Sequence, residues 1–323
     1  MNKNNKIIIL ILSIFFFCLT SCNNHFTAMN ILSGKDSNPP IYLGSKTISK
    51  NKIQLIFNES VNLNISEGKE SISSISYKGN LAYLWLKDTL QANEKLYLEF
   101  MTFDQSKNSS LVSCNIYGKN NNPAEVLINE LTTNGSAHSP DRTELLVTKS
   151  GNLAGLTLYQ GSNIYFLNRF ILPNLEVLSQ QYYVIWWTDS LPDGVDKTKN
   201  ICAKTSDLAT RNGCLSIYSD PSKSATCLDC VLWANHSGSA FDKFGNKENQ
   251  IQCLSLINSN NWEKIEPITG LLAVDSLKTT STRSISRWLN KKDNNNSSDW
   301  YITCTSGSTF GSDNISPIFT EKK

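Results

Sequence analysis

The chain has 323 residues, of which 40% are apolar, and its 30 basic residues nearly balance its 28 acidic residues. The apolar content is sufficient for a folded core, and the length suits two domains of about 100–200 residues each. The charge balance disfavours nucleic acid and anionic lipid as general partners, because proteins that bind phosphate backbones usually carry a basic surplus.

The first segment has the pattern of an export signal. Lys3 and Lys6 precede an almost unbroken run of Ile, Leu and Phe over residues 7–19. Such a run fits the about 7–15 apolar residues of a signal peptide and is shorter than the ~20 that a membrane span needs. It closes with Leu19-Thr20-Ser21-Cys22, which resembles the lipobox of bacterial lipoproteins.

The lipobox resemblance implies that residues 1–21 are a lipoprotein signal peptide and that Cys22 becomes lipidated, for example with palmitate, after cleavage. Cys22 would then anchor the chain to a membrane of the bacterial cell envelope, with the outer membrane or the cell surface favoured. An ordinary cleaved signal and an N-terminal anchor helix are the alternatives. Residues 22–38 mix small and polar residues without periodicity, which predicts a flexible tether.

Residues 39–119 have the pattern of a small antiparallel β-sandwich. Strands are predicted at residues 52–57, 81–86 and 95–100, where apolar residues alternate or cluster between turn-forming residues. The strand Ile53-Gln54-Leu55-Ile56-Phe57-Asn58-Glu59-Ser60-Val61 and the later Asp104 turn resemble the bacterial Ig-like domains of surface and secreted proteins. The resemblance implies a non-catalytic spacer or adhesive unit.

After a polar linker at residues 120–123, a second series of short strands covers residues 124–315. This series resembles the lamin-tail domain, an Ig-like β-sandwich found in bacterial extracellular proteins. The resemblance rests on the opening Ile128-Asn129-Glu130-Leu131, the Glu144 strand, the Asn152–Tyr159 turn and strand, the Arg283–Trp288 segment and the late Gly311-Ser312-Asp313-Asn314. The predicted fold is therefore all-β, with two tandem Ig-like β-sandwich domains behind a lipidated N-terminal tether.

Three polar segments, residues 132–142, 188–213 and 234–262, are predicted to be exposed loops. Loops on a rigid scaffold often carry the binding surface, so these segments are the predicted contact surface for an unknown protein or glycan partner. Trp186 and Trp187 end the strand before the second loop, and alternation along a strand predicts that one ring faces the core and the other the opposite side.

The cysteines favour covalent bracing of the C-terminal half. Seven remain after Cys18 and Cys22 are set aside, and they are Cys114, Cys202, Cys214, Cys227, Cys230, Cys253 and Cys304. Outside the cytosol such cysteines form disulfides, and an odd number leaves at least one thiol without an internal partner. The candidate pairs are Cys202 with Cys214, and Cys253 with Cys227 or Cys230. A zinc or redox site at the Cys227–Cys230 motif lacks the second cysteine pair or the helical context that such sites need.

Catalytic and metal sites receive little support from the sequence. Nucleophilic catalysis needs a base beside a Ser or Cys, and the chain offers only His25, His138 and His236. The oxygen-rich segment Asp293–Asp299 begins like a calcium loop but lacks the glycine and the glutamate that complete one. We therefore predict no catalytic residue, no cofactor and no metal, and a calcium ion at residues 293–299 stays a minor alternative.

The basic segment Lys278, Arg283, Arg287, Lys291 and Lys292 surrounds Trp288, a composition also found in nucleic-acid-binding surfaces. Alternation of Arg283, Ile285 and Arg287 instead predicts a half-exposed strand with a solvated basic face. The preferred function is a non-catalytic, membrane-anchored envelope protein that presents β-sandwich loops for binding or for envelope structure. A nucleic-acid-binding module of the lamin-tail type and an extracytoplasmic hydrolase are the alternatives.

Overall fold

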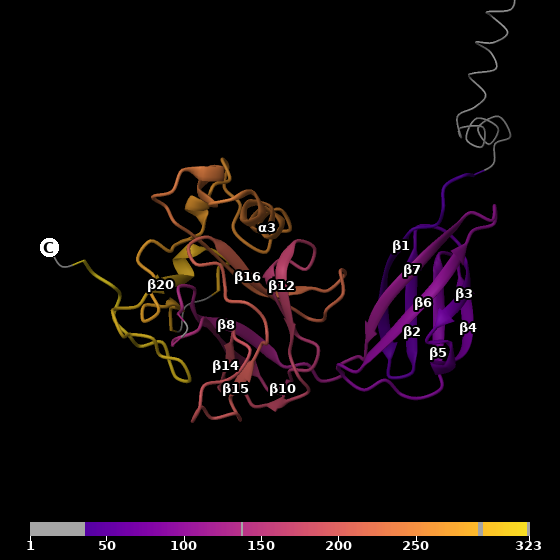
Figure 1. The fold of residues 1–323 in the computed structure, drawn as a ribbon, viewed down its shortest axis with the longest axis horizontal. Coiled ribbons are helices and arrows are strands. Elements are labelled where there is room, and N and C mark those ends of the chain that lie inside the picture. The colour runs from indigo at the N-terminus through magenta and orange to yellow at the C-terminus, as the bar shows by residue number, and fades with distance from the viewer. Residues whose placement is uncertain (1–35, 137, 290–292, 322–323) are drawn as a thin grey trace, which may run out of the picture. The chain divides into compact units, whose positions relative to one another are not determined.

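The computed structural model describes residues 36–136, 138–289 and 293–321 (Figure 1). The predicted signal peptide, Cys22, His25, most of the tether, Lys291 and Lys292 lie outside the described residues. Within them the chain is nearly all β-structure and contains one α-helix, which confirms the predicted all-β class. No helix of this part of the chain is long and apolar enough to span a membrane.

The described chain divides into two compact units. The first contains Asn51–Asp88, Leu96–Ile116 and the described residues before Thr47. The second contains Thr47–Lys50, Thr89–Lys95 and the described residues from Tyr117 onward.

The N-terminal strands form a four-stranded sheet in the order β1-β2-β5-β4 and a three-stranded sheet in the order β3-β6-β7. The short 3₁₀ helix η1 (Lys69–Ser71) joins β3 to β4. The strands are β1 (Tyr42–Ser49), β2 (Lys52–Phe57), β3 (Asn62–Glu67), β4 (Ile72–Lys78), β5 (Leu81–Leu86), β6 (Lys95–Phe103) and β7 (Ser109–Tyr117).

Alternation of side chains positions the core of the first unit. Along β2, Ile53, Leu55 and Phe57 are fully buried, whereas the residues between them are half-buried. Phe57 from one sheet meets Phe100 from the other in an edge-to-face contact with ring centroids 6.4 Å apart. The three strands predicted at residues 52–57, 81–86 and 95–100 are therefore confirmed as β2, β5 and the first part of β6.

The second unit is built on two larger sheets and a two-stranded ribbon of β10 and β13. The strands of the six-stranded sheet, in spatial order, are β15 (Asn200–Cys202), β14 (Tyr182–Trp186), β9 (Arg142–Lys149), β8 (Glu125–Thr132), β19 (Ile285–Arg287) and β20 (Trp300–Ile302). Those of the five-stranded sheet are β12 (Phe166–Ile171), β11 (Thr157–Gly161), β16 (Gly213–Tyr218), β17 (Cys227–Ala234) and β18 (Val274–Asp275). The ribbon pairs β10 (Gly151–Asn152) with β13 (Glu176–Val177).

One hydrophobic core joins the two large sheets. It includes Ile128 and Leu145 from the six-stranded sheet and Leu215 and Val231 from the five-stranded sheet, all fully buried. Trp187, which follows β14, is also fully buried and donates from Nε1 to Thr143 Oγ1 at 2.8 Å. The preceding Trp186 is half-buried and bonds Asn200 instead, so the prediction that the two rings take different sides is confirmed.

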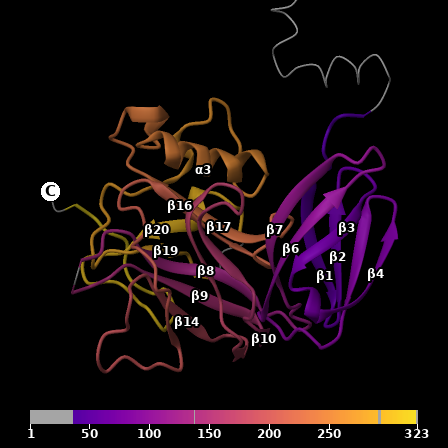
Figure 2. The same cartoon turned by 45° about the vertical axis from the view of Figure 1, so that its right-hand side comes forward.

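A helix occupies part of the segment that the sequence predicted to be an exposed loop. The helix α3 (Lys247–Asn258) lies over β16 and β17 in Figure 2 and contacts β16 and β11. Asn246 caps its N-terminus, and Cys253, Leu256 and Ile257 are buried against the sheet. The loop prediction for residues 234–262 is therefore wrong at residues 247–258. The apolar residues of α3 cover one face of β16, and every residue of β16 is buried.

Three further 3₁₀ turns complete the second unit. They are η2 (Ala240–Lys243), η3 (Gly270–Leu272) and η4 (Ser297–Asp299).

Candidate functional site

The strand register brings separate polar segments to one end of the C-terminal sandwich. Arg142, the first residue of β9, lies opposite both Thr132 at the end of β8 and Trp186 at the end of β14. Gly213 at the start of β16 lies opposite Trp233 near the end of β17. We call the surface formed by residues 132–136, 138–142, 187–213 and 234–239 the loop end.

Asp141 links two of these segments. Its Oδ1 accepts a hydrogen bond from Gly135 N at 2.7 Å, and its Oδ2 accepts one from Leu208 N at 3.1 Å. Its own carbonyl accepts from Trp187 N at 3.0 Å. Burial raises the pKa of the Asp141 carboxyl to about 7. A Cβ atom at Gly135 would lie 2.6 Å from Asp141 N, so this close approach requires glycine.

Further hydrogen bonds complete the scaffold of the loop end. Thr133 Oγ1 donates to Thr210 O at 3.0 Å. Asn212 accepts from Asn235 N through its side chain and from Asn249 Nδ2 of α3 through its carbonyl, both at 2.9 Å. The two loops predicted at residues 132–142 and 188–213 are thus brought together, and α3 supports them.

A polar groove of about 360 Å³ opens within the loop end. Its lining offers hydroxyl groups and two exposed carboxylates over the buried Trp187, and consists of Trp187, Thr188, Asp189, Thr205, Ser206 and Asp207. Asp207 also helps to raise the pKa of Asp141 by charge repulsion, although burial of Asp141 is the larger cause. The groove can therefore accept hydrogen bonds from a polar ligand and donate hydrogen bonds to it.

Neither His138 nor His236 lines this groove. The Nε2 atom of His236 lies 3.1 Å from the carbonyl oxygen of Ala273, and its Nδ1 lies 3.9 Å from Asp275 Oδ2. His138 is exposed in the loop between β8 and β9. The contacts of His236 are thus with a carbonyl and a carboxylate, not with a serine or cysteine nucleophile.

A second polar cluster is buried where β8, β9 and β19 meet residues 309–314. Glu130 on β8 accepts hydrogen bonds from Ser284 Oγ, from Ser286 Oγ at 3.2 Å and from Thr309 N at 3.0 Å. Glu144 on β9 accepts from Gly311 N and from Asn129 Nδ2, the latter at 2.7 Å. We call these two glutamates the carboxylate clamp, and residues 309–314 the closing segment.

The clamp residues are fully buried, and their chemistry reflects it. Burial raises the pKa of Glu144 to about 8 and also raises the pKa of Glu130. Burial lowers the pKa of the neighbouring Arg142, whose guanidinium stacks 4.1 Å from the Phe310 ring centroid of the closing segment. Asn314 Nδ2 donates to the carbonyls of Asn129 and Arg287, both at 2.9 Å, so the closing segment is tied to the first strand of the sandwich.

Arg287 is a buried ion-pair partner and not part of a solvated basic face. Its Nη2 lies 2.7 Å from Asp229 Oδ2, and its Nη1 lies 3.1 Å from Asp293 Oδ1. Burial raises the pKa of Asp229 to about 6, and the Arg287 guanidinium opposes that shift. The half-exposed strand predicted from the alternation is wrong, because all three residues of β19 are buried.

Other residues of the basic segment also have partners. Lys278 forms an ion pair with Glu321, and the guanidinium of Arg283 lies 4.3 Å from the ring centroid of Phe319.

In the candidate calcium loop, Asp299 is buried and accepts hydrogen bonds from Asn294 N at 2.8 Å and from Asn294 Nδ2 at 2.7 Å. The Asp299 carboxylate therefore stabilises the turn at residues 294–299.

The structure changes the predicted cysteine pairs. The Sγ of Cys202 lies 2.8 Å from Thr188 O, and Cys214 lies against Cys253 of α3. Cys230 lies against Cys227. Cys202 on β15 and Cys214 on β16 belong to different sheets, and all seven cysteines are thiols in this structure.

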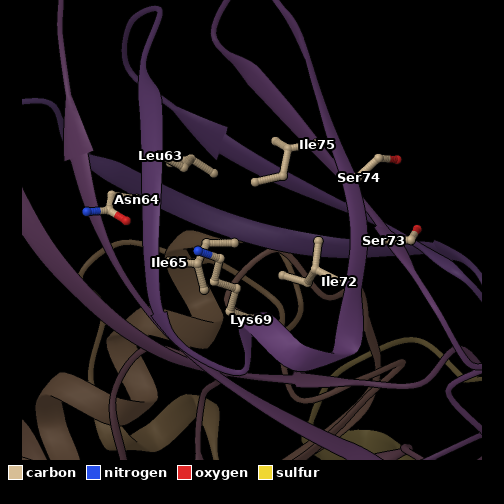
Figure 3. Close-up of a pocket in the computed structure, with 8 residues that line it drawn as sticks. All are labelled: Leu63, Asn64, Ile65, Lys69, Ile72, Ser73, Ser74 and Ile75. Atoms are coloured by element: carbon tan, nitrogen blue, oxygen red, sulfur yellow. The ribbon is translucent and has the colours of Figure 1, made fainter.

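The first unit has a cavity of about 230 Å³ between β3, η1 and β4 (Figure 3). Half of its lining residues are aliphatic and half are polar or charged, and they are Leu63, Asn64, Ile65, Lys69, Ile72, Ser73, Ser74 and Ile75. These side chains include neither a carboxylate nor an imidazole, and Lys69 is the one titratable side chain among them.

Carboxylates meet elsewhere in the first unit. Asp36, Glu59 and Asp104 each place an oxygen within 4.8 Å of the others, a donor set that suits a hard cation. Amide donors already occupy part of this set, because Asn38 N bonds Asp36 and Asn108 N bonds Asp104.

Sequence reasoning located the loops but missed the groove residues Asp189, Thr205 and Asp207. The available signal was the density of hydroxyl and carboxylate side chains in residues 188–213. It missed the carboxylate clamp too, although Glu130 and Glu144 belong to motifs already noted, because their donors lie far away in the sequence.

These observations define an all-β protein whose second unit is a two-sheet sandwich, with polar loops gathered at one end and its first strand fastened to its closing segment. A family model described as a protein second domain, TP_1001_2nd, matches residues 124–206 and 202–302, which together span more than half of the chain. The chain belongs to this family. No curated protein and no solved structure matches it significantly.

Proposed function

We propose that this protein is a non-catalytic, lipid-anchored protein of the bacterial cell envelope whose loop end binds a glycan. The observation that carries the proposal is an open polar groove lined by residues 187–189 and 205–207, in a loop that Asp141 fastens to the neighbouring loop through Leu208 N and Gly135 N. Binding residues are commonly placed on loops that a rigid scaffold positions. The anchor is supported by the sequence around Cys22, which lies outside the described residues.

The groove chemistry favours a polyhydroxylated ligand. The carboxylates of Asp189 and Asp207 can accept hydrogen bonds from sugar hydroxyls, and the Ser206 hydroxyl can both donate and accept. Both aspartates are exposed, so a ligand reaches them without a change in the fold.

The likeness of the second unit to a lamin-tail domain is part of the same proposal. The residues on which the resemblance rests lie far apart in the sequence, yet several meet in the structure. Glu130 accepts from Ser284, and Asn314 donates to the carbonyl of Arg287. These contacts are expected if the motifs belong to a single lamin-tail-like domain.

The binding proposal is tested on a glycan array with the soluble chain that begins after Cys22. We expect binding that Asp207→Asn or Asp189→Asn weakens at least tenfold, because each change removes a carboxylate acceptor. Asp193→Asn is the matched control, since Asp193 is an exposed aspartate in the same segment but outside the groove lining. If the chain binds no glycan and instead binds a protein through the groove, the glycan proposal is wrong.

The anchor is tested by protease shaving of intact and permeabilised cells, beside a known periplasmic protein. Loss from intact cells with the control protected supports exposure at the cell surface, and protection until permeabilisation turns the search to periplasmic partners. A Cys22→Ala variant should leave the membrane fraction. If it remains there, the lipid anchor is wrong.

A further inference from the structure

Four cysteines gather between α3 and the five-stranded sheet. Cys214 lies on β16, Cys227 and Cys230 lie on β17, and Cys253 lies on α3. Cys230 pairs with Ser216, which lies two residues from Cys214, so Cys214 and Cys230 share one face of the sheet. Cys214 and Cys253 are buried, with 2% and 0% of their surface exposed.

The four thiols form two contacts. The neighbouring Cys253 thiol raises the pKa of the Cys214 thiol, and the neighbouring Cys227 thiol raises the pKa of the Cys230 thiol, so each pair lies within interaction distance. Cys230 also lies 3.1 Å, measured from its Sγ, from the carbonyl oxygen of Asn261.

The arrangement favours a bonded pair over a metal centre. A tetrahedral zinc site with zinc–sulfur distances of about 2.3 Å holds its four sulfurs within ~4 Å of one another. Among the described residues, the one group of three candidate ligand side chains within 4.8 Å of one another is Asp36, Glu59 and Asp104. No three of these sulfurs are therefore gathered as a metal ion requires.

A bond between strand and helix would fasten two elements, whereas a bond within β17 would not. Cys227 and Cys230 lie on one strand on either side of a β-bulge, where the register shifts between Ile217 and Tyr218 of β16. A disulfide needs its two Cα atoms within about 7 Å. Cys214 and Cys253 come from separate elements that pack side against side, so no extended backbone holds them apart.

We propose that Cys214 and Cys253 form a disulfide that fastens α3 to β16 in the exported protein. The proposal rests on the proposed export, because disulfides persist outside the cytosol. The two thiols lose two protons and two electrons as the sulfur–sulfur bond forms. The electrons reduce the disulfide of an oxidant, either a dithiol oxidase or oxidised glutathione, to two thiols.

This bond would stabilise the support of the loop end. Asn249, four residues before Cys253 on α3, donates to the carbonyl of Asn212. Fastening the helix to β16 therefore also restrains the segment that carries the groove.

The test maps disulfides in two samples of the chain that begins after Cys22. One sample is purified from exporting cells without reductant, and the other is refolded from the reduced, unfolded state in oxidised glutathione. After free thiols are alkylated, trypsin separates Cys214 in peptide 212–223, Cys227 and Cys230 in peptide 224–243, and Cys253 in peptide 248–264.

A linked species of peptides 212–223 and 248–264 in both samples is expected. Linkage of either peptide to 224–243, or full alkylation in both samples, overturns the proposal. The linked species in the refolded sample alone supports the pairing but contradicts export, so the two failures are distinguishable.

A second measurement uses stability. The Tm of the oxidised chain should fall by several degrees when a reductant is added, and Cys253→Ala should abolish this response. Cys304→Ala is the matched control and should retain the response, because Cys304 lies outside the four-cysteine cluster. An equal response in Cys253→Ala and the wild type would overturn the proposal.

Discussion

The buried ion pair of Arg287 and Asp229 also satisfies backbone groups of β8. The strand β19 pairs with β8 at Glu130 and Leu131 and does not extend to Ile128. Asp229 Oδ2 accepts from Ile128 N at 2.7 Å, and Arg287 Nε donates to Ile128 O at 2.9 Å. Buried backbone groups need such partners, and the ion pair supplies them.

Replacing Arg287 should therefore be costly. Arg287→Met leaves the Asp229 carboxylate buried without its cation, and breaking a buried pair in this way typically costs about 3–5 kcal/mol. Urea unfolding of the second unit measures the loss. Arg283→Met is the matched control and should cost about 1 kcal/mol or less, since Arg283 contributes a stacking contact with Phe319. Equal losses would contradict the role assigned to Arg287.

Buried carboxyls should also make stability depend on pH. Burial raises the pKa of Glu144 to about 8 and that of Asp141 to about 7, whereas both lie near ~4 in an unfolded chain. The folded chain therefore keeps protons that the unfolded chain releases. The resulting stabilisation is complete below about pH 4 and is lost as the pH rises through 7 and 8.

We expect the free energy of unfolding to fall between pH 5 and pH 8, by at most about 1.4 kcal/mol per pH unit for each group. Urea titrations at unit pH intervals measure it. Glu144→Gln should flatten the dependence, and the exposed-site variant Asp193→Asn should keep it. Stability that rises over this interval in the wild-type chain would refute the assignment.

Local pattern was enough for several residues but not for those with distant partners. Alternation in Lys52–Phe57 correctly predicted a strand with Ile53, Leu55 and Phe57 inward. The same kind of alternation at Arg283, Ile285 and Arg287 gave the wrong exposure. The reason is that the burial of Arg287 depends on Asp229, 58 residues away, which no local period encodes.

At the scale of elements, the loops could be predicted from the sequence, whereas the helix α3 that supports them could not. Long polar segments between strands marked residues 132–142 and 188–213 as a surface, and the register places both at one end of the sandwich. The helix α3 escaped prediction because its apolar residues are interrupted by polar ones such as Gln252 and Ser255, which weakens the helical period. Packing against β16 supplies the stability that its own sequence lacks.

Asp141 offers a test of how the loop end is held. Asp141→Ala removes the acceptor for Gly135 N and Leu208 N, and each unpaired buried group costs about 1–3 kcal/mol. Amide hydrogen exchange at Gly135 and Leu208 should accelerate at least tenfold, while exchange in β16 changes less. Asp189→Ala, in the exposed groove, is the control and should leave both amides protected. Unchanged exchange at Gly135 and Leu208 would contradict the linking role of Asp141.

At the scale of the whole molecule, the closing segment is a structural part of the sandwich. Removing residues 304–323 leaves Glu130 and Glu144 buried without the donors at Thr309 and Gly311. We expect this truncated chain to lose the cooperative unfolding transition of the second unit, as measured by near-UV circular dichroism and urea titration.

A shorter truncation provides the comparison. Removing residues 320–323 affects the surface pair of Lys278 and Glu321 and leaves the carboxylate clamp intact, so stability should change by about 1 kcal/mol or less. Cooperative unfolding of the longer truncation at wild-type stability would show that the clamp does not hold the sandwich closed.

The carboxylate clamp also sets an order for assembly. Glu130 is made early in the second unit, and its donor Thr309 follows 179 residues later. A chain that emerges N-terminus first from a ribosome or an export channel therefore exposes both glutamates to water until almost the whole unit has appeared. The second unit therefore completes its fold late in biogenesis. It should remain accessible to proteases and chaperones until the closing segment has emerged.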